Sequence, residues 1–171
     1  AAGLNFTPNA EEYAGAVFSY GNWQRGPWQA QGALRADVRR IQPEEVRYSR
    51  RVGLIETRSF SGLSGGFSLQ YQPHTQIAAG ATLMRTFRAP GIEELFSEGP
   101  HLASYAYEVG SSSLDSERAW GMDVFFEFRR NRDHLNIALF RNQIDGYIFP
   151  KNTGQRSWRR ADLRSEEHTS E

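Results

Sequence analysis

Long runs of alternating apolar and polar residues constrain the fold of this chain more than any other feature. From Trp28 to Val38 every second residue is apolar or glycine, and most of the residues between them are polar or charged. The alternation returns over residues 63–72, 76–83 and 120–129. A period of two residues is typical of a strand with one apolar and one polar face. The sequence therefore predicts an all-β chain.

The alternation predicts six long strands. They span residues 11–23, 28–41, 59–72, 76–88, 117–130 and 133–149, and a seventh is expected to begin near Trp158. Most have about 12 to 16 residues, whereas a globular strand usually has about 5–6. A tilted strand needs about 9–11 residues to cross the apolar layer of a membrane. These lengths favour a transmembrane barrel whose strands extend past the bilayer.

The predicted connections alternate between short and long. The short ones are 24–27, 73–75 and 131–132, and the long ones are 42–58, 89–116 and 150–157. Outer-membrane barrels have short periplasmic turns and long outer loops. The alternative is a large soluble β-sandwich with an aromatic core, but both of its ends face the same water, so it has no reason to alternate. Aromatic residues beside the connections, such as Trp23, Trp28 and Tyr71, favour the membrane interface.

These patterns predict an open antiparallel meander in which strands pair in chain order. Its apolar face should be exposed rather than buried in a core. The side chains that test this expectation are those of Phe67, Leu69, Trp120, Val124 and Phe126.

The composition excludes several kinds of protein and site. Twenty cationic residues balance 20 acidic ones, so nothing indicates a nucleic-acid partner. Cysteine is absent, which excludes disulfides, thiolate metal sites and cysteine nucleophiles. The chain contains no run of 18 apolar residues, so it predicts no membrane-spanning helix. We expect no cofactor.

Several motifs resemble the barrel domain of TonB-dependent receptors. Residues 86–96 read Thr-Phe-Arg-Ala-Pro-Gly-Ile-Glu-Glu-Leu-Phe, and residues 99–103 and 107–110 read Gly-Pro-His-Leu-Ala and Tyr-Glu-Val-Gly. Residues 138–148 resemble the family's Ala-Leu-Phe-x-Asn-x-Ile-x-x-Tyr-Ile strand. Weaker similarity extends from about Glu12 to Leu163.

The resemblance implies that residues 1–163 are an incomplete section of a 22-stranded transmembrane β-barrel in the bacterial outer membrane. Such a barrel is closed by a plug and imports a scarce nutrient such as a metal chelate, haem or zinc. The implied partners are outer-membrane lipid, the small nutrient ligand, and the TonB complex. The TonB complex would act through a plug that we expect to lie outside this fragment.

The resemblance also singles out residues for the site. The motif residues are Phe87, Arg88, Ala89, Pro90, Glu93, Glu94 and Leu95. Pro90 has no backbone N–H to donate to a neighbouring strand, so it should end its strand at the outer rim. We expect Arg88 and the Glu93-Glu94 pair to form a charged network that braces the long loop. Ligand contact is the alternative role for these charges.

The long loop 89–116 is the predicted ligand-binding segment, because ordered loops beyond about 12–15 residues are usually functional. Its candidate ligand-binding residues are His101, Tyr105, Tyr107 and Glu108, with Phe96 as a further aromatic surface. We expect it to fold back over the barrel mouth. Imidazole and carboxylate suit zinc, so His101 is a weak candidate metal ligand. An ordinary loop histidine is the alternative.

Two other functions compete with a receptor. A general porin or structural barrel shares the alternation but lacks these motifs. An outer-membrane enzyme would need a nucleophile, a base and an acid, and Ser97, His101 and Glu98 could supply them. These three residues lie in one loop with no strand to hold them, so we expect no enzyme activity.

Residues 164–171 break the pattern of the chain. They read Arg-Ser-Glu-Glu-His-Thr-Ser-Glu, with no alternation and no aromatic residue. The segment matches the translation of a common short-read sequencing adapter, residue for residue. We therefore expect it to be a non-native tail and exclude it from the site.

Overall fold

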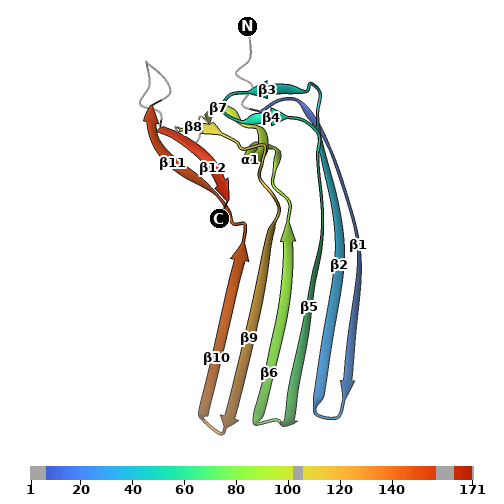
Figure 1. The fold of residues 1–171 in the computed structure, drawn as a ribbon. Helices are drawn as coiled ribbons and strands as arrows, with labels where there is room; N and C mark the ends of the chain where they lie inside the picture. Colours follow the sequence, from blue (N-terminus) through green and yellow to red (C-terminus); the bar gives the residue numbers. More distant parts are fainter. Residues whose placement is uncertain (1–6, 102–105, 157–163, 171) are drawn as a thin grey trace.

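The fold is a long, curved antiparallel sheet with small elements gathered at one end (Figure 1). The structure is a computed structural model that describes residues 7–101, 106–156 and 164–170. The long strands are β1 (Ala10–Arg25), β2 (Trp28–Pro43), β5 (Arg58–His74), β6 (Ile77–Arg88), β9 (Glu117–Arg130) and β10 (Asp133–Asp145). They pair in the order β1-β2-β5-β6-β9-β10, so each long strand neighbours the next in the chain. This arrangement confirms the predicted up-and-down meander, which is open because β1 and β10 are its outer strands.

Tight turns connect the strands at one end of the sheet, here named the turn end. Gly26-Pro27, Thr75-Gln76 and Asn131-Arg132 are the connections there. Gly26 and Asn131 have φ values of 56° and 51°, a left-handed conformation that glycine and asparagine tolerate best. The predicted short connections are therefore confirmed, with boundaries shifted by one or two residues.

The two faces of the sheet differ as the alternation predicts. Phe67, Trp120, Val124 and Phe126 are exposed, with Phe67 53% and Trp120 55% accessible. Leu69 is half-buried rather than exposed, beside Gly80 and Ala81 of β6. A row of exposed apolar side chains this extensive is unusual for a soluble protein.

The long connections fold at the opposite end, here named the loop end. Between β2 and β5 lies a hairpin of β3 (Arg47–Ser49) and β4 (Gly53–Ile55). Between β6 and β9 lie the helix α1 (Ile92–Phe96) and the strands β7 (Glu98–His101) and β8 (Ala106–Val109). No helix in the described ranges is long and apolar enough to cross a membrane.

These loop elements share one buried apolar cluster, here named the rim core. Its members come from β2, β5, β11 and the two long connections β2–β5 and β6–β9: Ile41, Val52, Ile55, Phe60, Ala89, Leu95, Phe96, Val109, Leu114 and Ile148. Ile41 lies on the same face of β2 as Asp37 and Arg39, because the three are spaced by two residues. The loops therefore pack on the polar face of the sheet and leave its apolar face uncovered.

The sixth strand is shorter than the predicted span 133–149. β10 ends at Asp145, Gly146 adopts a φ of 68°, and a separate strand β11 (Ile148–Arg156) follows. The chain turns here because the Ile148 amide donates to the Glu117 carboxylate at 2.6 Å and its side chain enters the rim core. Strand therefore replaces most of the expected loop 150–157, and the strand start expected near Trp158 lies outside the described residues.

A second sheet forms at the loop end with the order β11-β12-β8-β7. Its strand β12 (Arg164–Ser170) lies within the segment expected to be a non-native tail. A two-stranded sheet of β3 and β4 completes the strand arrangement of the described residues.

Candidate ligand-binding site

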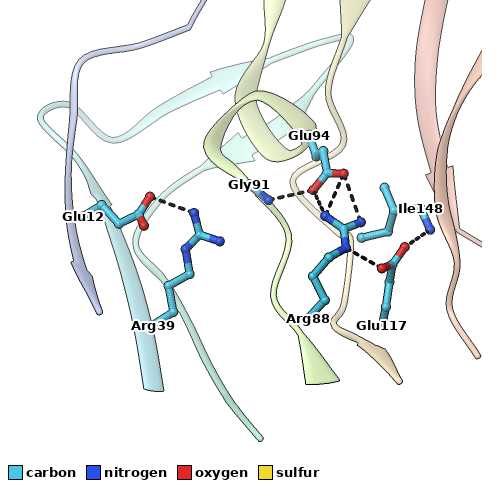
Figure 2. A network of polar contacts seen from close by, with 7 residues as sticks. All are labelled: Glu12, Arg39, Arg88, Gly91, Glu94, Glu117 and Ile148. Atoms are coloured by element: carbon cyan, nitrogen blue, oxygen red, sulfur yellow. Dashed lines mark hydrogen bonds and ion pairs between the residues drawn. The ribbon is translucent and has the colours of Figure 1, made fainter. Parts of the chain in front are cut away.

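Arg88 holds the loop elements to the sheet at the point where β6 ends (Figure 2). Its guanidinium donates to both carboxylate oxygens of Glu94 in α1 at 2.9–3.0 Å. It also bonds the Glu117 carboxylate, which accepts in turn from the Ile148 amide. One side chain thus connects β6, α1, β9 and the start of β11.

This network confirms part of the predicted brace and corrects the rest. Arg88 and Glu94 are joined as expected, and β6 ends two residues before Pro90. Glu93 does not take part through its carboxylate in the described residues; its backbone carbonyl accepts from the Ser97 amide at 3.1 Å. Glu117, rather than Glu93, is the second carboxylate that binds Arg88. Arg88 and Glu117 are direct partners in the β6–β9 register. The predicted strands 76–88 and 117–130 end and begin at these two residues, so the pair could have been found from the sequence.

Glu117 stays ionised because of these contacts. It is the first residue of β9, beyond the band of exposed apolar side chains, and its carboxylate is largely buried. The hydrogen bond from Arg88 lowers the pKa of Glu117, burial opposes this effect, and the Ile148 amide lowers the pKa further. The ion pair therefore persists at neutral pH.

The helix α1 is positioned by close backbone contact with the segment after β8. Glu94 closes the first turn of α1 by accepting from the Gly91 amide at 2.7 Å. The Gly110 amide donates to the Ser97 carbonyl at 2.7 Å, and the Ser111 amide donates to the Glu94 carbonyl at 2.9 Å. The motif containing Glu94 and the motif ending in Gly110 therefore form one packed unit.

Replacing Gly110 by alanine should loosen this unit. A β-carbon there would lie 2.7 Å from the Leu95 carbonyl carbon and 2.8 Å from the Glu94 carbonyl oxygen, so backbone must move. We expect a loss of about 1–3 kcal/mol, as for other overpacked sites. Hydrogen exchange of the amides in residues 92–110 of the full-length protein would measure it. Gly21→Ala is the matched control, because its β-carbon would meet nothing within 4 Å; equal exchange in both variants would contradict the predicted contact.

The β3–β4 hairpin is tied to the same unit. Arg58 donates to the backbone carbonyls of Ser112 and Leu114, the latter at 2.8 Å. The Ser112 amide donates to the Val52 carbonyl at 3.0 Å. The loops from both long connections therefore form one ordered layer rather than separate flexible segments.

Three of the predicted ligand-binding residues, His101, Tyr107 and Glu108, lie on β7 and β8 of this layer. His101 Nδ1 lies 2.5 Å from a carboxylate oxygen of Glu108, which is mostly buried, whereas His101 is 41% exposed. Tyr107 packs partly against the rim core, and the Arg51 guanidinium lies 5.1 Å from its ring centre. Tyr105 lies outside the described residues. Arg51 could not be predicted from the sequence, because only the packing of the two hairpins brings it to Tyr107.

The Ser97 hydroxyl is not placed as the nucleophile of a hydrolase. Ser97 is fully buried, and its hydroxyl has no hydrogen-bond partner in the described structure. No group of three or more histidine, aspartate or glutamate side chains that could hold a metal occurs among the described residues. His101 as a metal ligand stays a prediction. Imidazole, phenol and guanidinium groups together offer donors, acceptors and an aromatic face.

An open hollow lies on the polar face beside Arg88. Its walls include Ala14, Ala16, Asp37, Arg39 and Phe87, and its volume is about 340 Å³. Arg39 is paired with Glu12 at 2.9 Å across this wall, which Figure 2 shows beside the Arg88 network. The hollow connects the ordered loops to the polar face of the sheet.

Two solved structures share this fold. The hemophore receptor HasR of Serratia marcescens, solved as a double mutant with its hemophore HasA and heme, matches 96% of this chain with a TM-score of 0.72 and 15% identity. The siderophore receptor PirA from Pseudomonas aeruginosa matches 95% with a TM-score of 0.53 and 14% identity. This chain spans 30% and 37% of those two chains. At these identities the similarity establishes the fold alone.

Long paired strands, an exposed apolar face and folded loops at one end define a section of a large β-barrel wall with a structured mouth. The sequence profile described as "TonB dependent receptor-like, beta-barrel" matches residues 1–162. The chain belongs to this family, whose members are outer-membrane receptors of bacteria. The family match decides against a general porin.

Proposed function

We propose that this chain is part of a receptor in the bacterial outer membrane that imports a small nutrient using energy from the TonB complex. The observation that carries the proposal is the ordered loop layer. The Arg88 network and the rim core fix the β7–β8 hairpin at one end of the wall, over its polar face. There His101 and Tyr107 would offer a ligand an imidazole and a phenol.

The proposed activity is transport with no chemical change of the ligand. The exposed apolar face would contact outer-membrane lipid, and a plug outside this chain would contact the TonB complex. HasR binds heme and a hemophore, and PirA is a siderophore receptor. Iron-containing ligands are therefore the first candidates, and zinc is the second because of His101.

Substitutions at the hairpin test this function. In the full-length receptor, His101→Ala and Tyr107→Ala should each weaken uptake about tenfold, the effect of losing one strong polar contact. Uptake of haem, a ferric siderophore and zinc should each be measured in cells limited for that nutrient. Heat-modifiable gel mobility should show an assembled barrel in both variants.

The matched control is Tyr48→Ala, which removes an exposed tyrosine from the neighbouring hairpin. It should leave uptake unchanged. If His101→Ala and Tyr107→Ala import all three nutrients normally, the loop is a spacer and the ligand binds elsewhere.

We also infer that residues 164–171 are foreign to the receptor. The family match stops at residue 162, which supports this inference. Sequencing the genomic locus across codon 163 tests it directly. A continuous reading frame that encodes the same eight residues would make the segment native.

A further inference from the structure

A gap one strand wide separates β8 from β11 at the loop end, and we name it the strand slot. β12 fills it in this chain (Figure 1). β12 pairs antiparallel with β11, from Ile148↔Ser170 to Asn152↔Glu166. It pairs parallel with β8, from Arg164↔Ala106 to Glu167↔Val109. The two walls of the slot come from different connections of the sheet.

Strand β8 and the start of β11 are held by contacts that do not involve β12. On the β8 side, Ala106 and Val109 are buried, and β7 pairs along the other edge of β8. On the β11 side, Ile148 is buried and its amide donates to Glu117. The edge of β8 and the start of β11 are therefore positioned independently of β12, and their backbone groups require partners.

The pairing of β12 does not depend on a particular amino-acid sequence in this strand. The segment carries two glutamates, a histidine, an arginine and hydroxyl residues, without apolar alternation. Strand addition depends on main-chain hydrogen bonds, which any extended segment except proline can make. A sequence unrelated to the receptor can therefore occupy the slot.

We propose that in the full-length receptor the slot holds the return strand of the outer loop that begins with β11. This rests on the proposed function and on residues 164–171 being foreign. The native occupant would be the residues that follow Leu163 and lead to the next membrane strand. β12 runs antiparallel to β11 after a connection of seven residues, 157–163, as a return strand would. A tethered strand has an effective concentration in the millimolar range, which favours it over a separate peptide.

The return strand joins two outer loops into one sheet. It lies beside β8, which carries Tyr107 and Glu108 of the candidate site, and beside β11, which is bonded to Glu117. The loop after β10 thereby restrains the ligand-binding hairpin. Ordering or releasing this strand changes how firmly the β7–β8 hairpin is held, and the membrane strands stay as they are.

Hydrogen exchange in the full-length receptor tests the proposal. One variant replaces the residues between Arg156 and the next membrane strand by a proline-rich linker, which lacks the backbone N–H donors that strand pairing needs and so removes the occupant and keeps β11. The slot-facing amides of residues 106–109 should then exchange at least tenfold faster, while amides of α1 and β9 keep their protection. Unchanged exchange of residues 106–109 would overturn the proposal.

A second variant separates strand pairing from side-chain recognition. It replaces the first eight native residues after Leu163 by Arg-Ser-Glu-Glu-His-Thr-Ser-Glu, and protection of residues 106–109 should persist. Loss of protection in this variant would overturn the proposal that the slot accepts a strand regardless of its sequence. Exchange reports the slot whether or not His101→Ala alters uptake, so failure of the proposed function and failure of this inference give different results.

Discussion

Replacing Phe96 by alanine is expected to release the whole loop layer from the sheet. Phe96 is fully buried in the rim core, whose other members come from β2, β5, the two long connections and β11. Truncating a buried phenylalanine costs about 3–5 kcal/mol, because contacts are lost and a cavity remains. The loss should be local, since the apolar face of the sheet lies on the other side.

Native-state hydrogen exchange of the full-length receptor measures this loss. Amides of α1 and β8 should exchange two to three orders of magnitude faster, because each 1.4 kcal/mol is about tenfold. Barrel assembly, followed by heat-modifiable gel mobility, should persist. Nutrient uptake should fall, since the β7–β8 hairpin loses its support.

Phe96→Leu is the matched control for this experiment. It keeps a branched apolar side chain in the same place and leaves a smaller cavity, so it should cost less than Phe96→Ala. If Phe96→Ala exchanges no faster than Phe96→Leu, the rim core is not what holds the loops. The loops would then depend on the Arg88 network and on the hydrogen bonds that the loop backbones make.

The strands could be predicted from sequence because each face of the wall meets a different environment. One face carries Trp120 and Val124 and the other Gly121 and Asp123, so the period of two is continuous through β9. The end of β10 could not be located in this way. Tyr147 and Phe149 continue the apolar alternation past the turn, and only Gly146 marks the left-handed residue.

The loop elements could be predicted only as a long connection. α1 has five residues and β3 and β4 have three each, too few for a periodic pattern. They are stable because residues distant in sequence meet in the rim core. The His101–Glu108 contact likewise depends on the β7–β8 register, in which Gly99 is paired with Glu108 and His101 with Ala106.

Placing the same charged side chain on the two faces of β9 should give unequal results. Val124 and Asp123 are neighbours near the middle of β9 and point to opposite faces. Val124 lies beside Ala81 and Leu139 on the exposed apolar face. If lipid covers this face, Val124→Arg puts a guanidinium near the middle of the bilayer. That should lower the free energy of unfolding by about 2–4 kcal/mol.

Asp123→Arg is the matched control, because it introduces the same side chain one residue away, toward the polar interior. Its cost should be smaller, since an arginine on that face can be solvated or can pair with a carboxylate. Both variants of the full-length receptor should be unfolded with guanidinium chloride from lipid vesicles, with gel mobility as the readout. Equal losses would contradict the assignment of the two faces. A larger loss for Asp123→Arg would reverse the assignment, because the face that carries Asp123 would then be the one shielded from water.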